Sequence, residues 1–259
     1  MTRILLCGAN GKMGHVIRSC VSQRDDMEIV AGVDLNTAGT EFPIYASIDE
    51  VTETADVIID FSNPALLDSL LAYAKRTHTP LVAATTGYSA EQTAAIKAAS
   101  NDVAVFFTFN MSLGVNLLQS LAKQAARVLG GQFDIEIIEK HHNQKVDAPS
   151  GTAIMLAESI NEALNTPYEL VYDRHARREK RPVNEIGMHA VRGGTIVGEH
   201  EILFAGRDEQ ISLKHTATSK EVFAVGAVNA ASFLAGCKPG LYTMQDLLRS
   251  TDKEEEANA

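Results

Sequence analysis

The sequence predicts an α/β fold in which a doubly wound parallel sheet is joined to a second domain with a mixed α+β sheet. Over the first 110 residues, short apolar runs alternate with helical patterns, which is typical of a parallel sheet covered on both faces. After residue 112, several strand-like runs follow one another without intervening helices, which favours a mixed or antiparallel sheet. We therefore predict one domain from residues 1–112 plus 222–259 and another from residues 113–221.

The first domain is expected to contain five strands, each a short apolar run bounded by turn residues. A helix is predicted over residues 11–24, and Asn63-Pro64 is suited to begin another, because Asn caps helices and Pro fits their first turn. The predicted strands are residues 4–7, 29–33, 57–61, 81–84 and 103–107.

The second domain is expected to combine helices with strands that alternate apolar and polar residues. Helices are predicted over residues 115–129 and 152–164, and the chain is expected to be helical again from about 222 to 248 before an acidic tail at 252–259. The predicted strands are residues 134–139, 187–192, 195–204 and 209–216.

The composition excludes several classes of partner. The formal net charge of −10 argues against nucleic acid and anionic membranes as partners. Cys7, Cys20 and Cys237 are widely spaced and form no CxxC pair, so neither a disulfide framework nor a thiolate metal site is indicated. Since there is also no signal-peptide pattern and no apolar run of about 18 residues, the sequence predicts a cytoplasmic protein.

A glycine-rich turn joins the first predicted strand to the first predicted helix. Gly8 allows a tight turn, Gly11 lets the backbone approach a pyrophosphate, and the helix start presents free N–H groups to it. With a third glycine at Gly14, the spacing is a variant of the dinucleotide-binding fingerprint of Rossmann-type folds. By itself this variant is a weak signal, but its position between strand and helix is the one that nucleotide binding requires.

Asp34 ends the second strand, 20 positions after Gly14, where an acid can bind the hydroxyls of the adenine ribose. The alternative is a turn residue that only closes the strand. Leu35 and Asn36 offer no cation for a 2′-phosphate, so NADH is expected to bind better than NADPH, although Lys12 could reach a phosphate.

Two further loops follow predicted strands, at the sheet edge where open α/β folds bind ligands. Each is also compatible with ordinary turn chemistry, since Thr, Gly, Asn and Ser are common in turns. Their position favours contacts to the nicotinamide half of a dinucleotide. The residues in question are Ala84, Thr85 and Thr86 in one loop, and Thr108, Phe109, Asn110 and Met111 in the other.

Residues 139–153 concentrate groups that suit an anionic substrate which must receive a proton. His141 can donate a proton near neutral pH, and Lys145 can bind a carboxylate or act as an acid. The N–H groups of Gly151 and Thr152 open a predicted helix, where a carboxylate binds favourably.

Other interpretations of this segment remain open. Adjacent histidines such as His141 and His142 point apart, and no nearby residue completes a metal site, so no metal is expected. Either histidine could be a solvated loop residue, and Ser150 could serve only as a helix cap. Asp147 is assigned a loop-ordering role, and the basic run 174–181 is expected to be a solvated loop.

Residues 139–153 read E-K-H-H-N-Q-K-V-D-A-P-S-G-T-A, and this run closely resembles the signature of the dihydrodipicolinate reductase family. The first-strand run G-A-N-G-K-M-G at residues 8–14 is similar to that family as well, as are residues 110–116 and I-V-G-E-H at 196–200. The resemblance spans nearly the whole chain. It implies NADH- or NADPH-dependent reduction of a small cyclic dicarboxylate imine, on the route to diaminopimelate and lysine.

The resemblance also implies roles for individual residues. His141 would be the proton donor, Lys145 a second catalytic group and a substrate contact, and His142 with the amides of Gly151 and Thr152 would bind the substrate carboxylates. Asp34 would hold the adenine ribose, and the two threonine-containing loops the nicotinamide half. The pyrophosphate would be held by Gly8, Ala9, Asn10, Gly11, Lys12 and Met13.

The family further implies a homotetramer built through the sheets of the second domain, with C-terminal helices returning to the first. Two departures are visible: Ala84 replaces the usual first glycine of its loop, and Leu35 stands where many members carry a basic residue. Rival interpretations are another two-domain dehydrogenase acting on an amino acid or sugar, a family member with an altered substrate, and a nucleotide sensor without catalysis.

Overall fold

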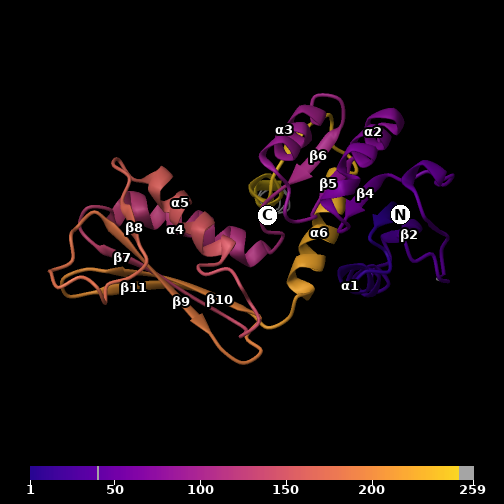
Figure 1. Ribbon diagram of the computed structural model, residues 1–259. Helices are drawn as coiled ribbons and strands as arrows, with labels where there is room; N and C mark the ends of the chain where they lie inside the picture. Colours follow the sequence, from indigo (N-terminus) through magenta and orange to yellow (C-terminus); the bar gives the residue numbers. More distant parts are fainter. Residues whose placement is uncertain (40, 251–259) are drawn as a thin grey trace. The chain divides into compact units, whose positions relative to one another are not determined.

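A computed structural model describes residues 1–39 and 41–250 of the chain (Figure 1). The chain divides into two compact units. Unit 1 consists of Met1–Leu113 together with the chain from Glu221 onward, and unit 2 consists of Gly114–Lys220. Among the described residues, no helix is both long and apolar enough to cross a bilayer.

Unit 1 is built on a seven-stranded, wholly parallel sheet with the strand order β12-β6-β5-β4-β1-β2-β3. All five predicted strands are present, and the short strands β3 and β12 were not predicted. The chain turns to opposite sides of β1 to form β2 and β4, which creates the topological switch point where such sheets bind ligands. The strands are β1 Thr2–Cys7, β2 Met27–Val33, β3 Ile44–Tyr45, β4 Val57–Asp60, β5 Leu81–Ala83, β6 Ala104–Phe107 and β12 Gly240–Tyr242.

Helices cover both faces of this sheet, as predicted for a doubly wound fold (Figure 1). Because side chains alternate along a strand, Ile4 and Leu6 of β1 pack toward one layer and Leu5 toward the other. Residues of α1 and α6 join the first layer, and residues of α2 and α3 join the second. The helices are α1 Lys12–Val21, α2 Leu67–Thr77, α3 Ala90–Ala99 and α6 Glu221–Leu234, with short 3-10 helices at Ile48–Glu50 and Pro64–Leu66.

The prediction of continuous helix from 222 to 248 is wrong. Helix α6 ends at Leu234, β12 follows, and residues 244–250 are helical again. Pro239 cannot donate a backbone hydrogen bond, and Gly240 disfavours helix, so the chain leaves the helix and pairs with β6 instead. The predicted acidic tail lies outside the described residues.

Unit 2 is a five-stranded mixed sheet with the order β11-β10-β7-β9-β8. The pairs β7–β9 and β8–β9 are parallel, whereas β7–β10 and β10–β11 are antiparallel, which confirms the predicted mixed sheet. Its elements are α4 Leu113–Leu129, β7 Asp134–His141, α5 Gly151–Ala163, β8 Glu169–Val171, β9 Glu185–Arg192, β10 Gly198–Ala205 and β11 Gln210–Ala217.

Helices α4 and α5 pack against one face of the unit 2 sheet. Ile135 and Ile137 of β7 form this core with Ile202 and Phe204 of β10 and with Leu156 of α5, all of them fully buried. The alternate side chains of the same strands, such as Ile138 and Leu203, point to the other face and are only half-buried.

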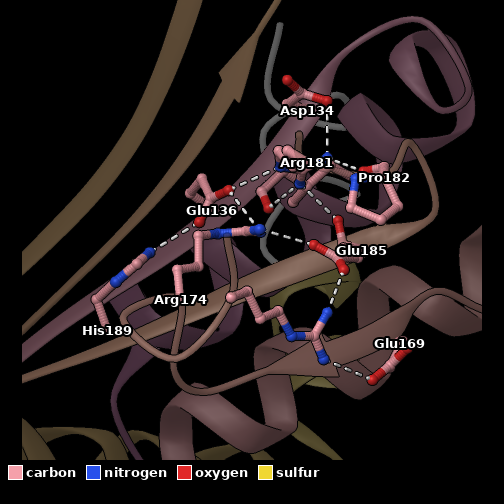
Figure 2. Close-up of polar contacts among 10 residues, drawn as sticks. Asp134, Glu136, Glu169, Arg174, Arg181, Pro182, Glu185 and His189 are labelled. Atoms are coloured by element: carbon pink, nitrogen blue, oxygen red, sulfur yellow. Dashed lines mark hydrogen bonds and ion pairs between the residues drawn. The ribbon is translucent and has the colours of Figure 1, made fainter. Parts of the chain in front are cut away.

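The basic run 174–181 is a loop with several exposed residues, as the sequence predicted, but it is not solvated throughout. Three of its arginines pair with carboxylates of the sheet (Figure 2). Arg174 and Arg177 lie 2.8 and 2.7 Å from the buried Glu185, and Arg181 lies 3.0 Å from Glu136. A buried carboxylate needs a paired cation. The arginines of 174–181 meet this need because the sheet brings Glu136 and Glu185 close to them, although Glu136 is distant in sequence.

Candidate active site

In unit 1, the glycine turn after β1 is tightly constrained by its surroundings. Gly8 has φ +79°, and a Cβ placed on it would lie 2.4 Å from the carbonyl oxygen of Phe61. A Cβ on Gly14 would lie 2.1 Å from the carbonyl oxygen of Gly8. Helix α1 begins directly after Gly11, which provides no side-chain cap. The turn therefore has the close backbone packing and the uncapped helix start that suit a dinucleotide pyrophosphate.

Asp34 lies beside this turn, at the carboxyl end of β2. Its carboxylate accepts hydrogen bonds from the backbone N–H groups of Asn10 and Asn36, both at 2.9 Å. A carboxylate has about four acceptor sites, so sites remain for ribose hydroxyls. Arg18 also reaches this region, 3.4 Å from Asn10 Oδ1, a cation that spacing in the sequence did not reveal.

A pocket of about 330 Å³ adjoins Asp34 at the carboxyl ends of β1, β2 and β4. Its lining is mainly apolar and includes Leu35, Ile48 and Leu70. Its place next to Asp34, the residue predicted to bind the ribose, and its apolar lining fit the adenine ring of a dinucleotide.

The two loops predicted to hold the nicotinamide half also lie at this edge of the sheet. Asp60, buried at the end of β4, accepts a hydrogen bond from Tyr88 Oη at 2.9 Å and one from Ser62 Oγ. The Ser62 amide in turn donates to Thr85 Oγ1 at 2.8 Å. Burial raises the pKa of Asp60 against the hydrogen bonds that lower it. Asp60 and Tyr88 thus order the Ala84–Thr86 loop, a role that the sequence did not reveal.

Ala84, the departure from the usual glycine, is buried in the core, whereas Thr86 is exposed. In the second loop, Asn110 Oδ1 accepts from the Ser112 amide at 2.9 Å, and Phe109 is 77% exposed. Met111 packs so closely on α6 that a Cβ on Gly226 would lie 1.7 Å from its carbonyl oxygen. These contacts hold the backbone of the loop in place, while the aromatic ring of Phe109 is exposed to solvent.

In unit 2, the predicted catalytic segment begins on β7. Glu139 and His141 are two residues apart and therefore lie on the same face of the strand, where His141 Nδ1 is 2.6 Å from Glu139 Oε2. Arg192 of β9 binds both oxygens of Glu139, at 2.7 and 2.8 Å. The Ser150 amide donates to Glu139 Oε1 at 3.1 Å. Neither Glu139 nor Arg192 was assigned a role from the sequence.

Helix α5 begins at Gly151, capped by Ser150, whose Oγ accepts from the Ala153 amide. The same oxygen lies 3.0 Å from His200 Nε2 on β10. The cap therefore has a second function, because it connects the start of α5 to a buried histidine. The structure thus brings Ser150, Glu139, His141 and His200 together.

Lys145 lies in the loop between β7 and α5, 2.9 Å from Asp147 Oδ1. The Lys145 ammonium, assisted by the Gly151 amide, lowers the pKa of Asp147. Lys145 and the start of α5 therefore already hold a carboxylate in this structure, that of Asp147. This agrees with a loop-ordering role for Asp147. It also means that these hydrogen-bond donors are placed to bind a carboxylate. His142 is half-buried in the same loop, and Thr152 lies in the first turn of α5.

No group of three or more His, Cys, Asp or Glu side chains arranged to hold a metal ion occurs among residues 1–39 and 41–250. The cationic side chains and amides around Lys145 are donors, and they suit an anion rather than a cation.

His200 should make unit 2 sensitive to acid. Burial, followed by the neighbouring His141, lowers the pKa of His200 from 6.5 to about 4. The folded protein then binds fewer protons than the unfolded chain between these values, so stability is present above about pH 6.5 and is lost as the pH falls toward 4. Between about pH 7 and pH 5 we expect the unfolding free energy of the wild type to fall by about 2 kcal/mol more than that of His200→Gln. Urea unfolding at the two pH values measures this difference. An unchanged pH dependence in the variant would contradict this.

Comparisons with known proteins match both units. The family described as dihydrodipicolinate reductase, N-terminus, matches residues 2–111, and dihydrodipicolinate reductase, C-terminus, matches residues 114–248. A 4-hydroxy-tetrahydrodipicolinate reductase of Caldanaerobacter subterraneus subsp. tengcongensis is 52% identical over 249 residues, which covers 96% of this chain and 99% of that protein. The enzyme of that name from Clostridium tetani is 48% identical, with 96% and 98% covered.

Solved structures agree with these matches. A dipicolinate-bound dihydrodipicolinate reductase from Paenisporosarcina sp. TG-14 is similar with a TM-score of 0.79 and 26% identity, covering 94% of this chain and 97% of that one. An amine dehydrogenase from Mycobacterium smegmatis has a TM-score of 0.62 at 11% identity, covering 94% and 95%. The second likeness concerns the fold alone.

Proposed function

The chain belongs to the dihydrodipicolinate reductase family, and we propose that the Glu139–Thr152 segment is its substrate and proton-transfer site. The activity is NAD(P)H-dependent reduction of 4-hydroxy-tetrahydrodipicolinate, in lysine biosynthesis through diaminopimelate. The observation that carries the site assignment is the buried Glu139–His141 pair next to Lys145 and the start of α5.

The cofactor assignment is supported by the turn after β1. Gly8 to Met13 hold the pyrophosphate, Asp34 the adenine ribose, and the loops after β5 and β6 the nicotinamide half. When bound, the reduced nicotinamide supplies a hydride to C4 of the conjugated imine ring of the substrate. The uncapped start of α1 and the apolar pocket beside Asp34 fit the pyrophosphate and the adenine ring of the dinucleotide that this chemistry requires.

The residues of unit 2 orient the substrate and provide the proton. Lys145 and the amides of Gly151 and Thr152 bind one carboxylate, which takes the place of Asp147, and His142 binds the other. His141, with Lys145 as the second acid, gives a proton to the electron pair that hydride addition displaces. The bound ligand of the Paenisporosarcina enzyme is dipicolinate, which supports a dicarboxylate as the substrate class here.

The decisive experiment is to follow the oxidation of NADH and NADPH with freshly generated 4-hydroxy-tetrahydrodipicolinate. Rapid, substrate-dependent oxidation supports the assignment. Binding of the reduced cofactor without oxidation would instead favour the altered-substrate or sensor interpretation. Dipicolinate should inhibit competitively with the substrate, and inhibition that is competitive with the cofactor alone would contradict a carboxylate site in unit 2.

NADH is proposed as the preferred cofactor, because Leu35, 91% exposed, follows the ribose acid where a cation would bind a 2′-phosphate. We expect Leu35→Arg to improve the ratio of NADPH to NADH affinity by about 10- to 100-fold, since one charge-assisted hydrogen bond contributes roughly 1.5–3 kcal/mol. Fluorescence titration of both cofactors measures this ratio. A wild-type preference for NADPH would contradict the proposal and would direct attention to Lys12 and Arg18.

A homotetramer assembled through the open face of the unit 2 sheet is proposed. This face carries Ile138 and Leu203 among charged residues such as Lys140, which lies 3.3 Å from Glu199. An apolar strip surrounded by paired charges is typical of a protein interface. We expect Leu203→Glu to reduce the assembly from four chains to fewer, measured by multi-angle light scattering. A monomeric wild-type protein would exclude this assembly.

A cytoplasmic location is also proposed. All three cysteines are free, and burial raises the pKa of Cys7, which keeps this thiol in its less reactive protonated form. Free thiols are suited to a reducing compartment. Cell fractionation with an antibody to the chain tests this location.

A further inference from the structure

Both oxygens of the Glu139 carboxylate have hydrogen-bond partners. The β7–β9 register places His141 opposite Arg192, so the arginine reaches back along the sheet to the carboxylate two residues earlier. Oε1 accepts from Arg192 and from the Ser150 amide, while Oε2 accepts from Arg192 and contacts His141 Nδ1. Glu139 itself is fully buried.

This carboxylate is ionised. Burial by itself raises the pKa of Glu139, but hydrogen bonds from Arg192, His141 and the Ser150 amide outweigh burial and lower the pKa below its ordinary value. A bidentate Arg–carboxylate pair is among the stronger polar contacts in proteins. A buried carboxylate held by several donors therefore remains an acceptor.

An ionised carboxylate cannot donate, so the hydrogen of the His141–Glu139 contact must lie on Nδ1. The other ring nitrogen, Nε2, then carries a lone pair in neutral His141 and the mobile proton in the imidazolium form. Nε2 faces the backbone of Gly198, where a Cβ would lie only 3.2 Å away. The absence of a side chain at Gly198 leaves this edge of the ring uncrowded.

We propose that Glu139, fixed by Arg192 and the Ser150 amide, is a positioning residue that keeps a proton on Nδ1 of His141 and makes Nε2 the atom that delivers a proton to the substrate. The proposal rests on the proposed function of His141. In the step itself, the Nε2–H bond breaks, its electron pair stays on the imidazole, and the proton bonds to the substrate electron pair displaced by the hydride. Glu139 touches no reacting atom.

The other ionisable groups around His141 do not compete with Glu139 for the Nδ1 proton, so Nε2 remains the nitrogen that can deliver a proton. His200 packs edge-to-face on the His141 ring, with 5.2 Å between ring centroids, and is neutral near physiological pH. Arg192 is paired with Glu139, and Lys145 is paired with Asp147. Of these neighbours, Glu139 is the one that accepts a hydrogen bond from the His141 ring.

The first test examines the resting wild-type enzyme. Long-range ¹⁵N–¹H spectra of histidine-labelled protein, with His141 assigned from His141→Ala, report which ring nitrogen carries hydrogen. We expect neutral His141 in the Nδ1–H form in the wild type and a substantial Nε2–H population in Glu139→Gln. A wild-type His141 protonated on Nε2 when neutral overturns the proposal, and this result requires no turnover.

The second test is kinetic and has a matched control on the same strand. Glu139→Gln should lower kcat by roughly 10- to 100-fold while the NADH dissociation constant stays unchanged. Glu136→Gln removes a carboxylate that also pairs with an arginine and a histidine, but on the opposite face of the sheet, and should leave kcat within about 2-fold. If Glu139→Gln fails to fold, Glu139→Gln/Arg192→Met removes both members of the buried pair.

A double-mutant cycle separates positioning from a general structural effect. In the His141→Ala background, Glu139→Gln should cause no further loss of turnover, because Glu139 acts through His141. If His141→Ala loses turnover while Glu139→Gln keeps the wild-type kcat, the proposal fails and the proposed function stands. If the wild type itself shows no turnover, the proposed function is contradicted instead.

Discussion

Replacing His141 by alanine should lower kcat for 4-hydroxy-tetrahydrodipicolinate by roughly 10²- to 10⁴-fold, the usual contribution of a positioned acid. His141 lies in unit 2, so the substitution does not alter the unit 1 turn that we propose binds the cofactor. The NADH dissociation constant should therefore stay within about 2-fold of the wild type, as in a loss confined to the chemical step. Steady-state turnover and fluorescence titration measure the two effects separately.

The control is His189→Ala. His189 also contacts a glutamate of β7 at 2.7 Å, but that glutamate is Glu136 on the other face of the sheet. Its loss should leave turnover nearly unchanged. Lys145→Ala should lower kcat and raise the KM for the substrate as well, because we propose that this ammonium also binds a substrate carboxylate. Full activity of His141→Ala would exclude His141 as the proton donor.

Replacing Gly14 by alanine should weaken NADH binding by about 10- to 100-fold. The new Cβ would lie 2.1 Å from the Gly8 carbonyl oxygen and 2.6 Å from that of Ala9, so the turn must move away from α1. Overpacking of this kind costs roughly 1–3 kcal/mol, and each 1.4 kcal/mol lost from binding is a tenfold change in affinity. Titration of NADH fluorescence gives the dissociation constant, and the melting temperature gives the part of the cost that falls on folding.

Gly236→Ala is the matched control, because no atom lies within 4 Å of a Cβ placed at this glycine of the same unit. It should bind NADH as the wild type does. Dipicolinate binding, which is assigned to unit 2, should survive in Gly14→Ala. Unchanged NADH affinity and melting temperature in Gly14→Ala would contradict the close approach between the turn and α1.

The regular elements followed from local patterns. Runs such as residues 57–59 and 81–84 are apolar throughout because parallel strands are buried on both faces, and the structure forms β4 and β5 there. The two-residue β3 and three-residue β12 lack such a pattern. Their pairing depends on a neighbouring strand that is distant in sequence, as Gly240–Tyr242 on β6 illustrates.

For the proposed site, the sequence identified the residues that have distinctive chemistry. Gly8, Gly14, Asp34, His141 and Lys145 were selected because their type and spacing match a chemical task. Residues that act only by contacting these site residues could not be identified from type and spacing. Arg192 lies 53 residues from Glu139, and no local pattern connects the two.

The sequence by itself determined the fold class, the family and the segment that carries the cationic cluster, because strand periodicity, glycine spacing and a run of specific side chains are local properties of the chain. The tertiary structure alone decided which groups meet: the bidentate pairing of Arg192 with Glu139, the hydrogen bond that Tyr88 donates to Asp60, and the pairing of Arg174 with Glu185. These contacts depend on strand register and on the burial of carboxylates, and a buried charge acquires its partner only when the sheet is assembled.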